Sequence, residues 1–167
     1  MAIARRERVT TVWLAAVGTV LVLGYAALAV VQILVLNPMA AAPGIPLAQI
    51  YSDMAEAGET MNTWFVVVGM SIGPIVALAV LVVAVARHDI TPVAVTVSYL
   101  TLLTLGPLAY FVASFGPGMS LADTYGISGA DYSPWAQPLF VTSAAALIAL
   151  VGVFAAVVAR RSASRPA

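Results

Sequence analysis

The sequence predicts an all-α integral membrane protein, a four-transmembrane-helix bundle with both termini cytoplasmic and two long extracytoplasmic loops. Hydrophobic residues make up 62% of the 167 residues and charged residues only 8%, with a mean hydropathy of +1.04. A soluble domain has about 45–50% apolar and about 25% charged residues, so this chain lacks the polar atoms to cover a water-exposed surface. The fourteen charges also fall in five short groups separated by four charge-free runs. We therefore treat residues 1–167 as a single transmembrane domain.

Each apolar run is long enough to cross a bilayer. The runs contain 22 to 25 residues, and a helix needs about 20 to cross the hydrocarbon core. The predicted spans are residues 12–36, 63–86, 92–115 and 138–159. We expect Thr91-Pro92 to begin the third span and Pro138 the fourth, because proline suits the first helical turn. Asn37-Pro38 and Gly116-Pro117-Gly118 are expected to stop the first and third spans.

The arginines predict the orientation. All seven lie in the two tails or in the short link between the second and third spans, whereas five of the seven acids lie in the other two loops. Arginine accumulates on the cytoplasmic side, which places both termini inside and loops 37–62 and 116–137 outside. We expect a multi-pass protein of the plasma (inner) membrane. The absence of lysine beside abundant Ala, Val, Gly and Pro is typical of a GC-rich bacterial genome.

One alternative concerns the first span. Arg5-Arg6, the apolar run and Ala40-Ala41-Ala42 resemble a signal peptide with its cleavage site. The apolar region of a signal peptide has about 7–15 residues, whereas this run has 25 and is long enough to span. A retained first span is the favoured interpretation.

The first outer loop is predicted to contain a short amphipathic helix over residues 46–57, opened by Pro46. Its apolar residues share one face. Asp53 and Glu56 lie on other faces of the helix, and Glu59 follows its end. A helix that lies on anionic lipid usually carries Lys or Arg, so we expect this one to pack on protein. A solvated acidic face is the favoured interpretation of Asp53, Glu56 and Glu59; a contact with a partner protein and a cation site are the alternatives.

A fragment of this loop recurs in the second outer loop, as residues 47–51 against residues 121–125. A duplicated helical hairpin would explain the match. Leucine and alanine matches are common in so biased a composition, so the duplication stays an open alternative.

Little in the chain indicates catalysis. It has no cysteine and one histidine, His88, in a short cytoplasmic turn, and no predicted span contains an ionisable residue other than tyrosine. Gly69-Met70-Ser71-Ile72-Gly73 matches the hydrolase nucleophile pattern, but that motif needs a strand-to-helix turn and a nearby histidine. Small residues at this spacing instead favour close helix packing. We expect packing faces at Gly69, Gly73 and Ala77 and at Gly152 and Ala156, and no catalytic, cofactor or metal residue.

Polar side chains inside the spans are the remaining candidates. Tyr25 and Gln32 lie on one face of the first span, and Thr101, Thr104 and Tyr110 lie in the third. The favoured interpretation is that Tyr25, Gln32 and Tyr110 make contacts between helices and that hydroxyls bond to carbonyls of their own helix. The alternative is that the third span lines a path for a substrate. Pro74 should kink the second span, because it removes the bond to the Met70 carbonyl.

Three functions are compatible with these features. The favoured one is a non-catalytic accessory subunit that packs on a larger membrane complex through small-residue helix faces and acidic outer loops. The alternative is a small homo-oligomeric channel or facilitator for a neutral solute. The third, an enzyme acting on lipid-linked substrates, is disfavoured because every arginine lies on the side opposite the outer acids. The expected partners are the lipid bilayer and another membrane protein or a second copy, and not nucleic acid.

Overall fold

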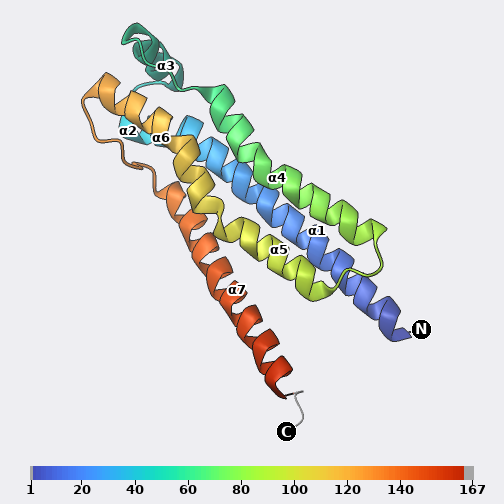
Figure 1. Cartoon of the computed structure of the whole chain (residues 1–167). Coiled ribbons are helices and arrows are strands. Elements are labelled where there is room, and N and C mark those ends of the chain that lie inside the picture. Colours follow the sequence, from blue (N-terminus) through green and yellow to red (C-terminus); the bar gives the residue numbers. More distant parts are fainter. Residues whose placement is uncertain (1, 164–167) are drawn as a thin grey trace.

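Nine helical segments form the chain, with no strand among residues 2–163, which the computed structural model describes (Figure 1). Arg165 lies outside the described residues, as does the side chain of Arg5. The segments are α1 (Ala2–Val31), the π-helical turn η1 (Gln32–Leu36), α2 (Asn37–Ala41), α3 (Leu47–Glu56), α4 (Thr63–Ala86), α5 (Pro92–Thr104), α6 (Gly106–Tyr125), the 3₁₀ turn η2 (Pro134–Ala136) and α7 (Gln137–Ala163).

Four helical stretches are long and apolar enough to cross a membrane, so the chain is a multi-pass membrane protein. They are Arg6–Ala41, Thr63–Ala86, Pro92–Tyr125 and Pro134–Ala163. The first, third and fourth are each longer than the apolar run that predicted them.

Helix α1 is the centre of the structure. It packs against α4 and α5, and α7 packs mainly on α5 (Figure 1). Its buried positions include Ala15, Val22 and Ala29, which are spaced at seven residues and so lie on one face. Alanines at two of these positions allow the neighbouring backbones to approach closely.

The prediction that Asn37-Pro38 stops the first span was wrong. The helix passes through η1 and continues as α2 to Ala41. Within this π turn the Asn37 backbone N–H donates to the Gln32 carbonyl. Pro38 is tolerated because it lies in the first turn of α2, where its missing N–H removes no hydrogen bond of α2 itself.

The prediction that Gly116-Pro117-Gly118 stops the third span was also wrong. Helix α6 continues to Tyr125 and ends at Gly126, which adopts a left-handed conformation with a φ of 64°. Glycine enters this conformation without a steric penalty, and a helix commonly ends at such a residue. The real stop signal was therefore the later glycine.

The third span is interrupted where the sequence analysis expected continuity. Helix α5 ends at Thr104 and α6 begins at Gly106, with Leu105 between them. Pro107 has no N–H, so it cannot donate to the carbonyl four residues earlier. Helix α4, in contrast, continues through Pro74.

Two helix starts can be compared with their predictions. Thr91 is confirmed as the N-cap of α5, because its side chain accepts a hydrogen bond from the Ala94 N–H at 3.2 Å. The fourth span begins earlier than Pro138. Ser133 caps the preceding 3₁₀ turn by accepting a hydrogen bond from the Trp135 N–H, and α7 follows from Gln137.

Candidate functional site: intramembrane polar contacts and a mid-membrane cavity

Two polar residues of the spans meet the second outer loop. The Tyr110 hydroxyl donates to Asp131 Oδ1 at 2.6 Å, and Gln32 Nε2 donates to the Ser133 carbonyl at 3.4 Å. Gln32 is fully buried beside Tyr110, and its Oε1 has no hydrogen-bond partner. The contacts of Gln32 and Tyr110 thus connect η1 and α6 to the loop before α7.

Asn37 fixes the same loop from the other side. Its Oδ1 accepts hydrogen bonds from the Tyr132 N–H at 2.7 Å and the Ser133 N–H at 3.4 Å. The π turn carries Gln32 at its start and Asn37 just after its end. Single π turns occur often at functional sites, and here the turn presents both side chains to one loop.

Tyr25 contacts α7. Its hydroxyl accepts a hydrogen bond from Ser143 Oγ at 3.3 Å. Its ring lies against Gly106, where an added Cβ would be 2.5 Å from the Tyr25 Cζ and hydroxyl oxygen. A glycine at the break between α5 and α6 therefore makes room for the tyrosine.

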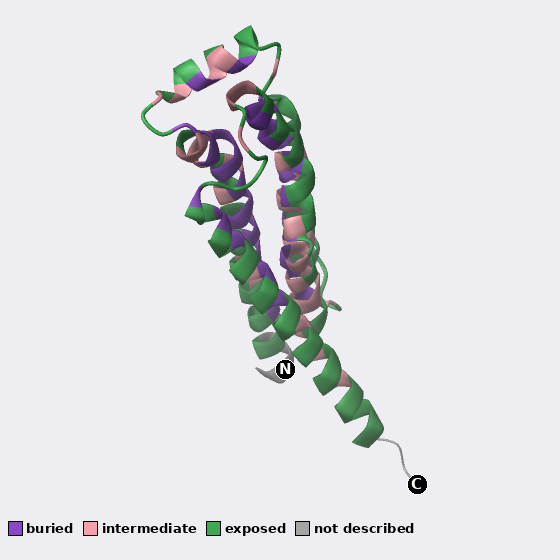
Figure 2. Ribbon diagram, turned by 90° about the vertical axis from the view of Figure 1, so that its left-hand side faces the viewer, coloured by how far each residue is buried: buried purple, intermediate pink, exposed green. Residues whose placement is uncertain are grey.

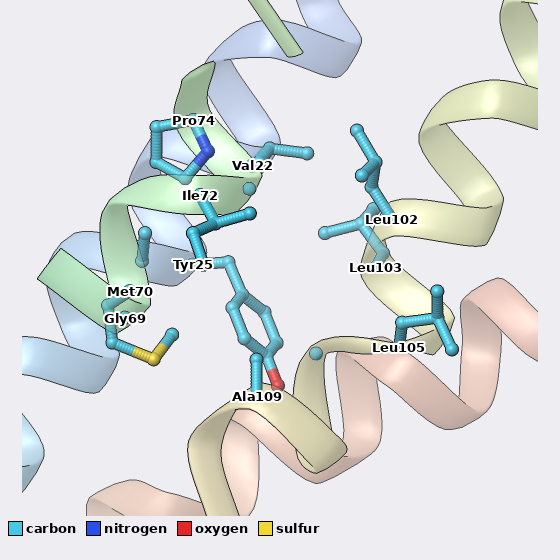
Figure 3. Close-up of a pocket in the computed structure, with 13 residues that line it drawn as sticks. Val22, Tyr25, Gly69, Met70, Ile72, Pro74, Leu102, Leu103, Leu105 and Ala109 are labelled. Atoms are coloured by element: carbon cyan, nitrogen blue, oxygen red, sulfur yellow. The ribbon is translucent and has the colours of Figure 1, made fainter. Parts of the chain in front are cut away.

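A cavity of about 180 Å³ lies beside this contact, between α1, α4 and the break in the third span (Figure 3). Two of the Gly-Pro pairs of the sequence contribute to its lining. Gly73 and Pro74 line one side, and Gly106 lines the other. Tyr25 supplies the single hydroxyl of the lining, and the other lining side chains are apolar. The cavity can accept apolar groups, but it offers no acid–base pair and no ligand set for a metal.

The hydroxyls of the third span divide into two groups. Thr96 and Ser98 donate to carbonyls four residues earlier in α5, as expected. Thr104 Oγ1 is buried without a hydrogen-bond partner, and Thr101 is exposed. The predicted intramembrane contacts of Thr101 and Thr104 are therefore not formed within the described chain.

An inner polar contact was missed by the sequence analysis. The Tyr99 hydroxyl donates to the Ala77 carbonyl at 2.9 Å and lies 2.8 Å from Thr19 Oγ1. Thr19 also donates to the Ala15 carbonyl of its own helix. The contact connects α1, α4 and α5, and no spacing rule within one helix could have indicated it.

The five residues of the predicted packing faces lie in different surroundings. Ala77 is fully buried, and an added Cβ on Gly73 would lie 3.7 Å from Val22 Cγ1. Gly69 lines the mid-membrane cavity, with no atom within 4 Å of an added Cβ. Gly152 and Ala156 are exposed on α7. These last two face away from the rest of the described chain.

The outer acids also differ from one another. Asp53 Oδ2 accepts a hydrogen bond from the Tyr125 hydroxyl at 2.8 Å, which fixes α3 to the end of α6. Tyr51 holds the other side of α3 by donating to the Leu34 carbonyl at 2.9 Å, and burial raises the pKa of its phenol. Glu56 is exposed and Glu59 is half-buried, and neither makes a side-chain hydrogen bond or ion pair within residues 2–163. Two of the three acids are thus available to a partner.

The turn between α4 and α5 carries an ion pair. Arg87 pairs with Asp89 at 3.1 Å, and both side chains are about two-thirds exposed. The hydrogen bond from Arg87 lowers the pKa of Asp89 below its usual value. His88 is exposed beside them. So exposed a pair contributes little to stability.

No group of three or more His, Cys, Asp or Glu side chains in residues 2–163 is arranged to hold a metal ion. The fold and these contacts define an all-helical multi-pass membrane protein whose polar side chains join its helices to one another and to the outer loops. No protein-family model, curated protein or solved structure matches the chain.

Sequence reasoning missed the partners of three predicted intramembrane residues, which are Asp131, Ser133 and Ser143, and the contact of Asn37 with the same loop. Asn37 was interpreted as part of a stop signal, and residues 116–137 only as an outer loop. The sequence did indicate weakly that some partners lie outside the spans. Buried polar groups need hydrogen-bond partners, and the predicted spans contain few polar side chains that could supply them. The pairing itself depends on how the second outer loop folds back, which local patterns do not encode.

Proposed function

We propose that the chain is a non-catalytic accessory subunit that packs against another protein of a larger membrane complex. The observation that carries this proposal is the exposure of α7. Only 11% of the most apolar stretch of the fourth span is buried within the chain, against 39% for the first. The C-terminal half of α7 is exposed along its length (Figure 2).

The residues exposed on α7 favour a protein neighbour over lipid alone. Gly152 has no atom within 4 Å of an added Cβ, and Ala156 follows one turn later on the same face. Small residues at this spacing let two helix backbones approach closely, which supplies van der Waals contact that lipid tails supply less well. The occupant we propose is a transmembrane helix of a second protein.

The chemistry of the cavities supports a non-catalytic role. The mid-membrane cavity offers one hydroxyl, that of Tyr25, and the histidine lies in an exposed turn. The nucleophile-like Ser71 donates to the Val67 carbonyl at 2.6 Å, so its hydroxyl is used within α4. The lining of the mid-membrane cavity offers no positioned acid and base for a reaction.

The outer contact with the partner is proposed to involve Glu56 and Glu59 and not Asp53. Asp53 is held by Tyr125, and its loss would loosen α3 itself. Of the three acids that the sequence offers as partner contacts, Glu56 and Glu59 are retained in this proposal. Their contribution should weaken with salt, because exposed charges are screened at physiological ionic strength.

The distribution of arginine supports the orientation that this function needs. Arg6 and Arg8 lie near the start of α1, Arg87 lies in the turn between α4 and α5, and Arg160 and Arg161 lie in the last turn of α7. We propose that both termini and this turn are cytoplasmic, that α3 and the second outer loop are outside, and that the membrane is the plasma membrane of a bacterium.

The test replaces the small residues of α7. The chain has no cysteine, so Ala156→Cys gives a single site for crosslinking to a neighbour in native membranes. Gly152→Leu in the Ala156→Cys chain should abolish the crosslinked product, and Gly152→Leu with Ala156→Leu should abolish co-purification in mild detergent. The matched control is Val151→Leu with Val158→Leu, since these residues are 60% and 61% exposed at similar depths on another face. If the leucine pair at 152 and 156 leaves the complex intact, the proposed interface is wrong.

One observation favours the alternative of a small homo-oligomeric channel for a neutral solute. Thr104 Oγ1 is buried without a partner at the interruption of the third span, one turn from the exposed Thr101. Interrupted transmembrane helices often surround solute paths, because free backbone groups are tolerated there. Migration as a symmetric oligomer, with solute flux lost in Thr101→Leu and Thr104→Leu, would favour the channel over the subunit.

A further inference from the structure

A second cavity, of about 250 Å³, lies at the outer end of the spans, between α6, the start of α7 and the second outer loop. Asp131, Asn37 and Ser114 supply its polar side chains, besides the Tyr110 hydroxyl. The remaining side chains of its lining are mainly aromatic. It is separate from the mid-membrane cavity and from the exposed face of α7.

The Asp131 carboxylate has an open side in this cavity. Tyr110 donates to Oδ1, and no residue of the described chain bonds to Oδ2. No arginine or lysine lies in either outer loop to neutralise it. A carboxylate at the border of the membrane, without a cation of its own, favours a cationic ligand.

Aromatic rings surround the rest of the cavity. Phe140 packs edge-on against Tyr110, with ring centroids 5.8 Å apart, and Phe111 lies 5.7 Å from Phe115. Phenylalanine rings attract a cation through their faces, and aromatic groups of this kind recognise ammonium ligands in other proteins. A carboxylate and several rings in one cavity therefore select an organic ammonium group over a metal ion.

Asn37 adds an independent indication that the cavity is built for a ligand. The residue lines the cavity but is only 7% exposed. Its Oδ1 accepts two backbone N–H groups, whereas its Nδ2 makes no hydrogen bond within the described residues. An amide donor that has no protein partner is free to donate to an acceptor in the cavity that Asn37 lines. The ligand should thus carry an acceptor oxygen near its ammonium group.

The backbone is shaped to keep Asp131 at this position. Gly118 of α6 and Gly129 of the loop approach so closely that a Cβ added to Gly118 would lie 3.2 Å from the Gly129 carbonyl oxygen. The glycines therefore allow the loop to lie directly on α6. This contact and the hydrogen bonds that Asn37 Oδ1 accepts from the Tyr132 and Ser133 N–H groups hold the loop at the outer end of the spans.

We propose that this outer cavity binds the headgroup of an aminophospholipid, with the ammonium group at Asp131 and a phosphate oxygen at Asn37. A membrane lipid, and not a free amine, fits the exposure of the rings. Phe111 and Phe115 are 60% and 58% exposed on a membrane-spanning helix, so acyl chains can continue along α6. Such a headgroup carries an ammonium group and a phosphate together. The ammonium group can donate to the Asp131 carboxylate, and a phosphate oxygen can accept from the Asn37 amide.

The test is native mass spectrometry of the full chain in mild detergent, titrated with phosphatidylethanolamine, phosphatidylglycerol or ethylammonium. The expected result is one retained phosphatidylethanolamine, bound about tenfold more tightly than phosphatidylglycerol, because a hydrogen bond to a charged group is worth at least this factor. Asp131→Asn keeps the acceptor for Tyr110 but removes the charge, so it should fold normally and lose the preference. Asp123→Asn is the matched control, since Asp123 is an exposed outer acid that does not line the cavity.

Three results would overturn the proposal. Equal retention of phosphatidylglycerol would exclude selection of the ammonium group. An unchanged preference in Asp131→Asn, or an equal loss in Asp123→Asn, would exclude Asp131 as its partner. Retention of ethylammonium without retention of the phospholipid would assign the cavity to free amines.

Discussion

Gly18→Ala tests a close contact between α1 and α5, that of Gly18 with the Tyr99 ring. A Cβ added at Gly18 would lie 2.4, 2.6 and 2.7 Å from three ring carbons of Tyr99, whereas ordinary van der Waals contact begins at 3.4 Å. The nearest of these is Cγ, at the base of the side chain, so a rotation of the ring cannot relieve the overlap. Helix α5 must move away from α1 by about 1 Å to accommodate the methyl group.

That movement also breaks the inner polar contact. The Tyr99 hydroxyl lies 2.8 Å from Thr19 Oγ1 and 2.9 Å from the Ala77 carbonyl oxygen, and a further ångström takes both beyond hydrogen-bonding distance. Overpacking costs about 1–3 kcal/mol, and a hydrogen bond between membrane helices is worth about 0.6–2 kcal/mol. Alanine regains up to about 1 kcal/mol of helix stability over glycine. We expect a net loss of about 2 kcal/mol in the free energy of unfolding.

The assay is unfolding by SDS in mixed micelles, followed by far-ultraviolet circular dichroism and tryptophan fluorescence. Gly24→Ala is the control in the same helix, because no atom lies within 4 Å of its added Cβ, and it should be neutral or slightly stabilising. In a Tyr99→Ala background the ring is absent, so Gly18→Ala should cost almost nothing, giving a coupling energy of at least about 1 kcal/mol. Equal stability of the Gly18 and Gly24 variants would refute the packing argument.

Two further predictions concern the outer loops. Single cysteines at Ser52 and Ser128, both exposed, should react with a membrane-impermeant maleimide in intact cells. A single cysteine at Ser162 should react only after lysis. Labelling of position 162 in intact cells would reverse the proposed orientation. Tyr125→Phe removes the hydrogen bond to Asp53, worth about 0.5–1.5 kcal/mol, so amide hydrogen exchange should accelerate in α3 and not in α7. Unchanged exchange in α3 would show that this hydrogen bond does not hold the helix.

The spans were predictable because their signal is local and additive. Each predicted run corresponds to one of the four membrane-crossing stretches, since an apolar run of sufficient length has few alternatives in a helical membrane protein. The Thr91 cap was predictable for the same reason, because the capping side chain and the N–H that it accepts are three residues apart.

The ends and interruptions of the spans were less predictable. Pro117 lies inside α6, whereas Pro107 lies at the break between α5 and α6, although both follow a glycine. The outcome depends on the neighbours, because Tyr25 lies against Gly106 and Gly129 lies against Gly118. A Gly-Pro pair therefore marks a weak point of a helix, and tertiary packing decides whether the helix breaks there.

The polar contacts followed from the sequence only in part. Tyr25, Gln32 and Tyr110 were identifiable because a polar group inside a span needs a partner. The partners lie 118, 101 and 21 residues away along the chain, and these separations depend on how the helices and the second outer loop are placed. Sequence patterns indicate which side chains need partners but not which residues supply them.

The two ends of α7 have different surroundings. The proposed partner interface and the proposed phospholipid site therefore lie on different parts of this helix. Its fully buried residues are Leu139, Ser143 and Ala146, which share one face in the outer part of the helix. The same face continues inward only as partly covered residues, while Gly152 and Ala156 are exposed. The outer part thus packs within the chain and borders the aromatic cavity, and the inner part is left for a neighbour. Loss of the partner in the α7 leucine variants should therefore leave phospholipid retention unchanged, and Asp131→Asn should leave the complex intact.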